Sequence, residues 1–452
     1  MIDFNIEKIN QRVNNANLHA TPVNIADDMI ELLVNTGFFD EPNNDMTAED
    51  YVSSHRVLDI YCKSGSLLYS CYKKFMVALR HVIPDRDDRD YFIVRNLLYG
   101  VCPSISCINT LRDIFYNNKK YDLSHELGNF FLYDLEKEEG SDKDIVKELL
   151  KPMKFDVVVG NPPYNNDAYL DFVMLGHKLA KSYDLWITPA KFSFRTDYRN
   201  KCCFDNIKKS LSKIVYFTDC SDVFNIAEIG GVAYYLCDVN KESSNISVTS
   251  IASCNSYCNS IKEYDSVNNI KTLDIYADSI IDKVNNCNKF AFRNNVSDKY
   301  AVASSVMPAI GGGKQQGTYI FSKDGNLQFL AKYHFDTYAN ISSLSNNYRI
   351  MFSGSNSECK SFISYIDTRF IRFLLFIAKC SNSVMCTDVW RFVPDSGSFD
   401  HIFEDKPLDG YTPDENGIYT DKDGVVHCSL YIKYKLTQQE IDVIESVIRE
   451  RK

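Results

Sequence analysis

The sequence lacks any hydrophobic run long enough to span a membrane. Its most apolar stretch, Phe373 to Ala378, is far shorter than the ~20 residues of a membrane helix, and Arg369 and Arg372 stand just before it. The segment Met1 to Asn10 carries Asp and Glu and has no apolar core of the kind that a secretion signal needs. We therefore expect no membrane span and no secretion, and a location in the cytoplasm.

An excess of positive charge is also missing. The 50 Lys and Arg residues are outnumbered by 60 Asp and Glu residues, so the formal net charge is −10. This balance excludes a surface that is basic all over. Any face that binds nucleic acid must therefore be local.

The cysteines lack the spacing of a metal site. The chain has 15 of them, but closely spaced pairs show neither a paired Cys-x-x-Cys motif nor nearby histidines. These pairs are Cys202 with Cys203, Cys254 with Cys258, and Cys380 with Cys386. We expect reduced, buried thiols and no metal.

What is present predicts an α/β fold. At 452 residues the chain is long enough for two domains. From Arg56 to Val239, short β-rich apolar runs alternate with amphipathic stretches, which is typical of a Rossmann-like doubly wound, mostly parallel sheet. The expected strands are 57–60, 98–102, 129–132, 155–159, 185–188, 214–218 and 232–237. The expected helices are 66–79, 104–116, 142–150 and 170–181.

The character of the sequence changes after Asn240. Residues 241–270 are rich in Ser, Asn and Cys, which predicts a loop-rich boundary segment. Beyond it, residues 271–452 are mixed in pattern, with a helix expected from Lys360 to Ala378. We interpret residues 1–240 as one domain and 271–452 as a second, α+β domain.

The most informative stretch runs from Phe155 to Tyr164, where an apolar strand enters the tetrapeptide Asn161-Pro162-Pro163-Tyr164. Two prolines fix the backbone and remove two donors. In that geometry the Asn161 side-chain oxygen and the Pro162 carbonyl can accept hydrogen bonds from an amino group and aim its lone pair at an electrophile. Tyr164 offers a flat face on which a base can stack. The catalytic candidates are therefore Asn161, Pro162 and Tyr164.

The motif resembles that of amino-methyltransferases, and its context resembles gamma-class N6-adenine DNA methyltransferases of restriction-modification systems. The early motif His19-Ala20-Thr21-Pro22 stands before an expected helix, Asn24 to Leu33. The resemblance implies a class I fold that binds S-adenosylmethionine, with Thr21 and Pro163 among the cofactor contacts.

The cofactor loop implied by the resemblance is Val57 to Ser66, in which Asp59, Cys62 and Gly65 are binding candidates. A glycine lets the backbone approach a ligand, and the start of the following helix favours its carboxylate. Lys63 departs from the family pattern, which has a glycine there. If that position needs a positive φ, the lysine costs about 1–2 kcal/mol, so a decayed cofactor site stays an alternative.

Three other positions belong to the same resemblance. Cys102 stands where the family usually has an acidic residue for the ribose. Asp134 would bind the adenine amino group of the cofactor, with a solvated turn aspartate as the alternative. Phe224 would stack on the target base, and an ordinary core phenylalanine is the competing interpretation.

The second domain would read DNA. Lysines and arginines outnumber acidic residues between Lys289 and Lys332. The functional interpretation is that these side chains contact DNA phosphates. The alternative is an ordinary solvated face of the domain. The DNA-binding candidates are Lys289, Arg293, Lys299 and Lys314.

The function implied is methyl transfer from S-adenosylmethionine to N6 of a flipped adenine in double-stranded DNA. A cognate restriction endonuclease or helicase subunit is the expected protein partner. Two alternatives stay open: methylation of RNA or of a protein glutamine, and a catalytically impaired DNA-binding subunit.

Overall fold

A computed structural model describes most of the chain. The described residues are 20–43, 46–116, 129–151, 155–190, 198–217, 223–224, 231–251, 260–293, 295, 298, 300–305, 318–322, 327–331, 348–378 and 390–448. They fall into two compact units, one holding residues up to 251 and 261–270, the other holding residues from 271 onward together with residue 260.

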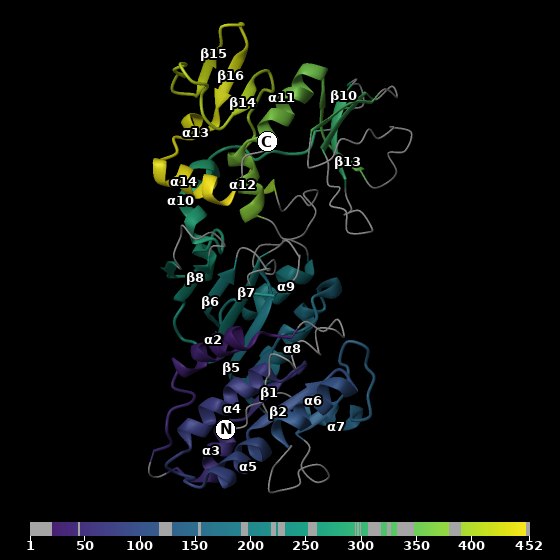
Figure 1. Cartoon of the computed structure of the whole chain (residues 1–452), viewed down its shortest axis with the longest axis vertical. Coiled ribbons are helices and arrows are strands. Elements are labelled where there is room, and N and C mark those ends of the chain that lie inside the picture. Colours follow the sequence, from purple (N-terminus) through teal and green to yellow (C-terminus); the bar gives the residue numbers. More distant parts are fainter. Residues whose placement is uncertain are drawn as a thin grey trace. The chain divides into compact units, whose positions relative to one another are not determined.

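The first unit is built on a nine-stranded sheet with the order β3-β2-β1-β4-β5-β7-β6-β8-β9 (Figure 1). Strands β3, β2, β1, β4 and β5 run parallel, as do β6 and β8, whereas β7 is antiparallel to both of its neighbours, β5 and β6. The strands are β1 (Val57–Asp59), β2 (Leu98–Cys102), β3 (Phe130–Leu132), β4 (Phe155–Gly160), β5 (Ala180–Pro189), β6 (Leu211–Phe217), β7 (Val232–Asp238), β8 (Ile246–Ile251) and β9 (Ser260–Tyr264). The predicted α/β fold with a mostly parallel sheet is confirmed.

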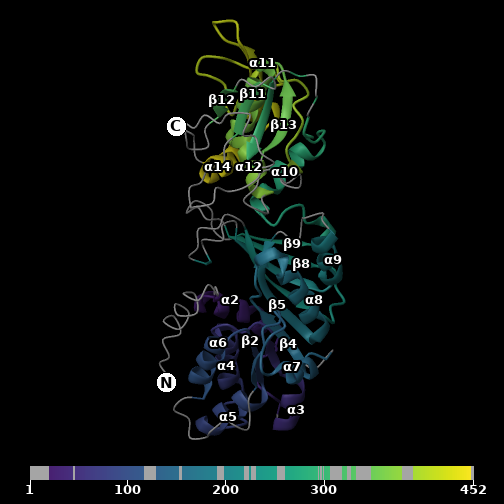
Figure 2. The ribbon, with the colours of Figure 1, turned by 90° about the vertical axis from the view of Figure 1, so that its right-hand side faces the viewer.

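Helices cover both faces of this sheet (Figures 1 and 2). On one face α4 packs against β1, β2 and α2; on the other, α8 packs against β4, β5 and α9. The helices of this unit are α2 (Val23–Val34), α3 (Ala48–Ser54), α4 (Ser66–Ala78), α5 (Arg86–Asn96), α6 (Ile105–Phe115), α7 (Lys143–Leu149), α8 (Tyr169–Leu179) and α9 (Tyr198–Ile207).

The strand side chains explain the double layer. Successive residues of a strand point to opposite faces, so Val157 and Val159 of β4 join the core formed with α2 and α4, while Val158 lies beside Gly176 of α8. All six residues of β4 are buried. A strand buried on both faces is apolar along most of its length, which is why the valine run of β4 was recognisable in the sequence.

One expectation about this region is wrong. The segment 241–270 was expected to be a loop-rich boundary, but its described part contains β8 and β9 of the sheet. In β8, Ile246, Val248 and Ser250 are buried and alternate with half-buried residues. Serine and threonine on the outer positions concealed this alternation behind a composition typical of loops.

The second unit is α+β. A four-stranded sheet has the order β12-β11-β10-β13, and a three-stranded sheet has the order β14-β16-β15. The strands are β10 (Tyr300–Ser305), β11 (Thr318–Ser322), β12 (Leu327–Ala331), β13 (Tyr348–Gly354), β14 (Ile402–Glu404), β15 (Ile418–Thr420) and β16 (Val426–Ser429). The helices are α10 (Asp278–Asn285), α11 (Asn356–Asp367), α12 (Arg369–Ile377), α13 (Leu430–Lys433) and α14 (Gln438–Val447).

The helix expected from Lys360 to Ala378 is two helices. Thr368 ends α11 and caps α12, its hydroxyl accepting a hydrogen bond from the Ile371 amide. The backbone N–H groups of Arg369 and Phe370 donate to the Asp405 carboxylate. A threonine cap and a half-buried carboxylate therefore begin a new helix where periodicity alone predicted a continuous one.

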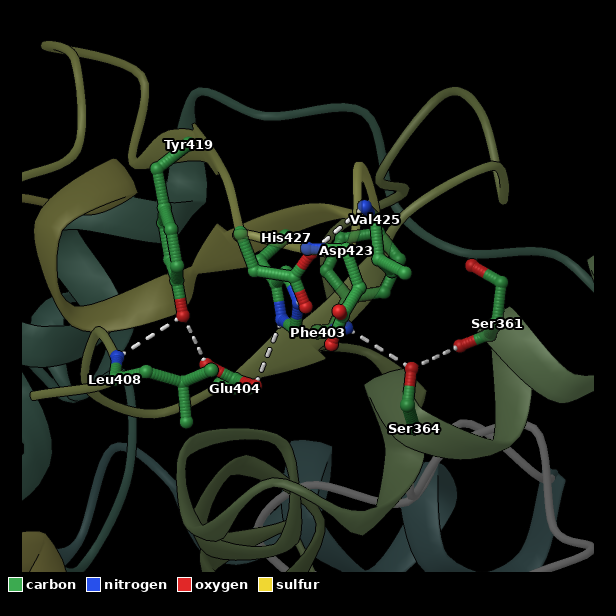
Figure 3. Close-up of polar contacts among 10 residues, drawn as sticks. Ser361, Ser364, Phe403, Glu404, Leu408, Tyr419, Asp423, Val425 and His427 are labelled. Carbon is green, nitrogen blue, oxygen red and sulfur yellow. Dashed lines mark hydrogen bonds and ion pairs between the residues drawn. The ribbon is translucent and has the colours of Figure 1, made fainter. Parts of the chain in front are cut away.

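The three-stranded sheet is held by a polar cluster around His427 of β16 (Figure 3). Its Nδ1 lies 2.9 Å from Glu404 and its Nε2 lies 3.2 Å from Asp421. Tyr419 stacks on the imidazole and donates its hydroxyl to Glu404. Two carboxylates thus face the two ring nitrogens, so both carboxylates are satisfied when the imidazole is doubly protonated.

Candidate cofactor and catalytic site

The candidate site lies at the carboxyl ends of β1 and β4. The strand order reverses between these two neighbours, and ligands of open α/β sheets bind outside the strand ends at such a switch point. A hollow at this place is lined by residues from three parts of the first unit. The lining residues are Thr21, Asp59, Tyr61, Lys63, Ser64, Gly65, Ser66, Leu67 and Asn161.

The tetrapeptide from Asn161 to Tyr164, here called the proline corner, follows β4 directly. Gly160 ends the strand against the Trp186 indole, and a Cβ at Gly160 would come within 2.6 Å of that ring. Asn161 is next and is 5% exposed. Its Nδ2 donates a hydrogen bond of 3.1 Å to Thr21 Oγ1. This bond fixes the orientation of the Asn161 amide group and with it the position of the acceptor oxygen.

Thr21 has a different local role from the one that the early motif suggests on its own. Thr-Pro before a helix is typical of a helix cap, but the N-cap of α2 is Pro22, without a side-chain hydrogen bond. The Thr21 hydroxyl instead accepts from Asn161. Two motifs that are 140 residues apart therefore meet in one buried contact.

The loop after β1 forms the floor of the hollow. Asp59 accepts a hydrogen bond from the Tyr61 amide at 3.1 Å, and the Cys62 thiol bonds to the same carboxyl group. Burial raises the pKa of Asp59 to about 7, although these hydrogen bonds and the charge of Lys63 oppose the shift.

Gly65 is the glycine that this loop requires. It stands at the N-cap of α4 with φ +79°, a backbone conformation that residues with a Cβ rarely adopt. An added Cβ would also clash with Leu111 Cδ2. The loop therefore keeps its critical glycine, and Ser64 and Ser66 beside it are hydrogen-bonded through their hydroxyls at 2.9 Å.

Lys63 is not strained. Among the described residues the non-glycine positions with positive φ are Glu138, Asp167 and Lys435, so the cost considered for a lysine at position 63 does not arise. The side chain is 8% exposed and lines the hollow. Burial lowers the pKa of Lys63 to about 8, against the opposing charge of Asp59.

Cys102, where the resemblance implies a contact with the ribose, lies in the hydrophobic core. Cys102 ends β2, is fully buried, and belongs to the hydrophobic core. Burial raises the pKa of its thiol well above the usual range. The side chain of Cys102 is therefore a core residue, and the family's acidic residue has no substitute at this position.

Asp134 is buried in a tight turn after β3. One carboxylate oxygen accepts from the amides of Glu136, at 3.0 Å, and of Lys137, at 3.4 Å. The other lies 3.3 Å from the Lys137 ammonium. The interpretation as a solvated turn aspartate is wrong about solvation, since Asp134 is 6% exposed, and its role toward the cofactor stays a prediction.

Two aromatic candidates lie side by side. The rings of Tyr164 and Phe224 meet edge to face, with centroids 6.1 Å apart. The Tyr164 hydroxyl donates to the Ile187 carbonyl at 3.2 Å. Phe224 is buried, whereas Tyr164 and Pro163 are half-buried, so the tyrosine has the more accessible face.

The DNA-binding candidates are engaged within the second unit where they are described. Lys289 donates to the Val284 carbonyl at 2.6 Å, and Arg293 donates to both carboxylate oxygens of Asp395 at 2.5 Å. Lys299 and Lys314 lie outside the described residues, as does His19 of the early motif. Phosphate contact by these side chains stays a prediction.

One cluster of ligand-type side chains was not indicated by any sequence motif. His177, Asp184 and Cys237 place ligand-type atoms within 4.8 Å of one another. Asp184 accepts from Trp186 Nε1 at 2.5 Å and lies 2.6 Å from His177 Nδ1. The three residues come from α8, β5 and β7, so no local spacing could have revealed them.

Comparison with known proteins adds a sequence relative. No family model matches the chain. An uncharacterized adenine-specific methylase of Mycoplasma pneumoniae is 32% identical over 109 residues, which is 21% of this chain and 26% of the relative. The chain is similar to an adenine-specific methylase. The resemblance inferred from the motifs is thereby confirmed over a segment that spans about a quarter of the relative.

Several solved structures with some similarity come from restriction-modification systems. The EcoKI M protein of a type I restriction enzyme matches at TM-score 0.35 and 13% identity over 46% of each chain. A type I methyltransferase subunit from Streptococcus thermophilus matches at TM-score 0.34 and 15% identity, over 55% of this chain and 50% of that one. At these values a shared activity does not follow.

The described helices also bear on the membrane prediction. None of them combines the length and the apolar character that crossing a bilayer requires.

Proposed function

We propose that this chain is an S-adenosylmethionine-dependent DNA methyltransferase that modifies N6 of a flipped adenine. The observation that carries the proposal is the hydrogen bond between Asn161 and Thr21 above the β1 loop. It joins the amino-group acceptor to the start of α2 and to the candidate cofactor loop in one hollow.

The chain's own residues would divide the work as follows. The Asn161 side-chain oxygen and the Pro162 carbonyl accept hydrogen bonds from the target amino group, which directs its lone pair. The half-buried ring of Tyr164 stacks on the base, and Phe224 supports that ring from its edge. Bound S-adenosylmethionine would supply the methyl group from its sulfonium.

The cofactor contacts that we propose come from four segments. Thr21 precedes α2. The β1 loop contributes Asp59, Cys62 and Gly65. Asp134 follows β3, and Pro163 belongs to the proline corner. Asp59 and the turn of Asp134 fit a ligand that carries amino groups, since both are buried carboxylates. Cys62 acts through Asp59, to which its thiol is hydrogen-bonded.

We further propose that residues 271–452 form a target-recognition domain for double-stranded DNA. The resemblance of the motifs to those of restriction-modification methyltransferases makes a cognate endonuclease or helicase subunit the partner that we propose. Lys289 and Arg293 would have to exchange their protein partners for phosphates.

A methyl-transfer assay with duplex DNA tests the proposal. Asn161→Ala removes the acceptor oxygen and should lower the transfer of labelled methyl by about 10²- to 10³-fold, the cost of removing one such polar group. Asn165→Ala, an exposed position in the same segment, is the matched control and should keep full activity. Full activity in Asn161→Ala would contradict the assignment.

Two alternatives have their own discriminating results. Preferred methylation of RNA or of a protein glutamine, when these compete with duplex DNA, would indicate another substrate for the same corner. Absence of S-adenosylmethionine binding in calorimetry at high micromolar cofactor would favour an impaired DNA-binding subunit. The ordinary backbone of Lys63 and the intact Gly65 turn favour a working cofactor site over a decayed one.

A further inference from the structure

Lys63 places a cation inside the candidate cofactor hollow. A lysine on a loop commonly extends its ammonium into water, yet this side chain is 8% exposed and lines the hollow with Thr21, Asp59 and Asn161. Its Nζ lies 5.5 Å from the centre of the Tyr61 ring. The charge is therefore held at the site where a ligand is expected to bind.

The surroundings of this ammonium are suited to an anion. Burying a charge is costly unless the charge is paired. Helix α4 begins at Ser66, three residues after Lys63, and its N-cap, Gly65, has no side chain to accept from the helix N–H groups. Backbone N–H groups at a helix start favour negative charge, so the lysine and the helix start act on the same kind of group.

Asp59 provides the opposite charge in the same hollow. It and Lys63 favour each other's ionised form, although burial opposes both. A ligand that carries an ammonium and a carboxylate on the same carbon can present an opposite charge to each of these two side chains. An α-amino acid group has this arrangement.

We propose that Lys63 Nζ binds the α-carboxylate of the cofactor's methionine part while Asp59 binds its α-ammonium. This inference rests on the proposed function, because it names a further recognition residue within the same cofactor site. It assigns a role to the residue that departs from the family's glycine. Lys63 then makes affinity depend on the amino-acid end of the cofactor as well as on the nucleoside.

Three probes that differ only at this end test the inference with the wild-type protein. S-adenosylhomocysteine has both charged groups, its decarboxylated analogue keeps only the ammonium, and 5′-methylthioadenosine has neither. Calorimetric titration should show that removing the carboxylate weakens binding at least tenfold. Equal affinities for S-adenosylhomocysteine and its decarboxylated analogue would overturn the assignment.

Variants at position 63 test whether the loss of affinity depends on the lysine. Lys63→Met keeps the aliphatic stem and should weaken S-adenosylhomocysteine at least tenfold while leaving 5′-methylthioadenosine within twofold. Lys63→Arg keeps the charge and should recover part of the loss. Lys73→Met on α4, which removes an ion pair with Asp27 at the surface, should change neither ligand.

The contradicting outcomes are separable. If Lys63→Met weakens all three probes alike, the lysine only supports the loop and the inference is wrong. If wild type and Lys63→Met bind S-adenosylhomocysteine equally, the inference fails while the proposed function stands. If wild type binds none of the probes, the proposed function itself fails.

Discussion

At the scale of single residues, the contact between Asn161 and Thr21 shows what a motif order can and cannot predict. The order of the two motifs indicated that both belong to one site, and they meet at 3.1 Å. The direction of side chains was not predictable in the same way. Lys63 and Tyr61 line the hollow because the loop turns them inward, and Cys102 turns into the core; each depends on packing against residues distant in sequence.

The Thr21 hydroxyl acts as a positioning group for Asn161. Thr21→Val keeps the shape of the side chain but leaves the Asn161 amide nitrogen without this acceptor, so we expect methyl transfer to fall about 10- to 100-fold, in line with 1–3 kcal/mol for an unsatisfied buried group. Thr21→Ser retains the hydroxyl and should recover most of the activity. Equal losses in both variants would indicate a packing role alone.

The charged pair at the hollow should make cofactor affinity depend on pH. Burial raises the pKa of Asp59 to about 7 and lowers the pKa of Lys63 to about 8. As pH falls through 7 Asp59 becomes neutral, and as pH rises through 8 Lys63 loses its proton, so both charges coexist between these values. Calorimetry with S-adenosylhomocysteine from pH 6 to pH 8.5 should give its tightest binding near pH 7.5. An affinity that keeps rising down to pH 6 would contradict this account.

At the scale of elements, the buried strands β1 to β7 and the helices expected between them were predictable, whereas polar elements were not. The strands from β1 to β7 follow apolar runs because both faces of the sheet are covered. The polar helix α5 was not expected: its residues are mostly charged, and it is marked by Asp85, whose carboxylate caps the first turn. That aspartate was the available signal.

The start of α4 is the element boundary on which the cofactor loop depends. Gly65→Ala forces a Cβ into a left-handed backbone conformation and against Leu111, so we expect a loss of about 2–4 kcal/mol in the free energy of unfolding and weaker cofactor binding. Gly397→Ala has a similar φ of +85° with nothing within 4 Å. That control should lose only about 1–2 kcal/mol and leave cofactor binding unchanged.

Thermal unfolding and calorimetry compare the two glycine variants directly. The difference between them measures the clash with Leu111, because the backbone cost is common to both. If Gly65→Ala unfolds and binds cofactor like Gly397→Ala, the tight turn is not needed for the loop.

At the scale of the whole molecule, the sequence indicated the class of each part better than the role of the second. A mostly parallel sheet and an α+β region were both expected and both are present. The side-chain contacts of the second unit could not be predicted from the sequence, because they join residues that are far apart in the chain. The bonds of Arg293 to Asp395 and of His427 to Glu404 are examples. Local charge therefore did not indicate that Lys289 and Arg293 have partners within that unit.

The two units would supply the parts that the proposed reaction requires: Asn161 as the amino-group acceptor, the candidate cofactor loop from Val57 to Ser66, and a second unit as candidate reader. The most direct test of the central claim is the identity of the product. Duplex DNA of mixed sequence would be incubated with the protein and S-adenosylmethionine, digested to nucleosides and analysed by mass spectrometry. We predict N6-methyladenine with the wild-type chain and none above background with Asn161→Ala. A product modified only on cytosine, or no methylated nucleoside from a protein that binds the cofactor, would contradict the account.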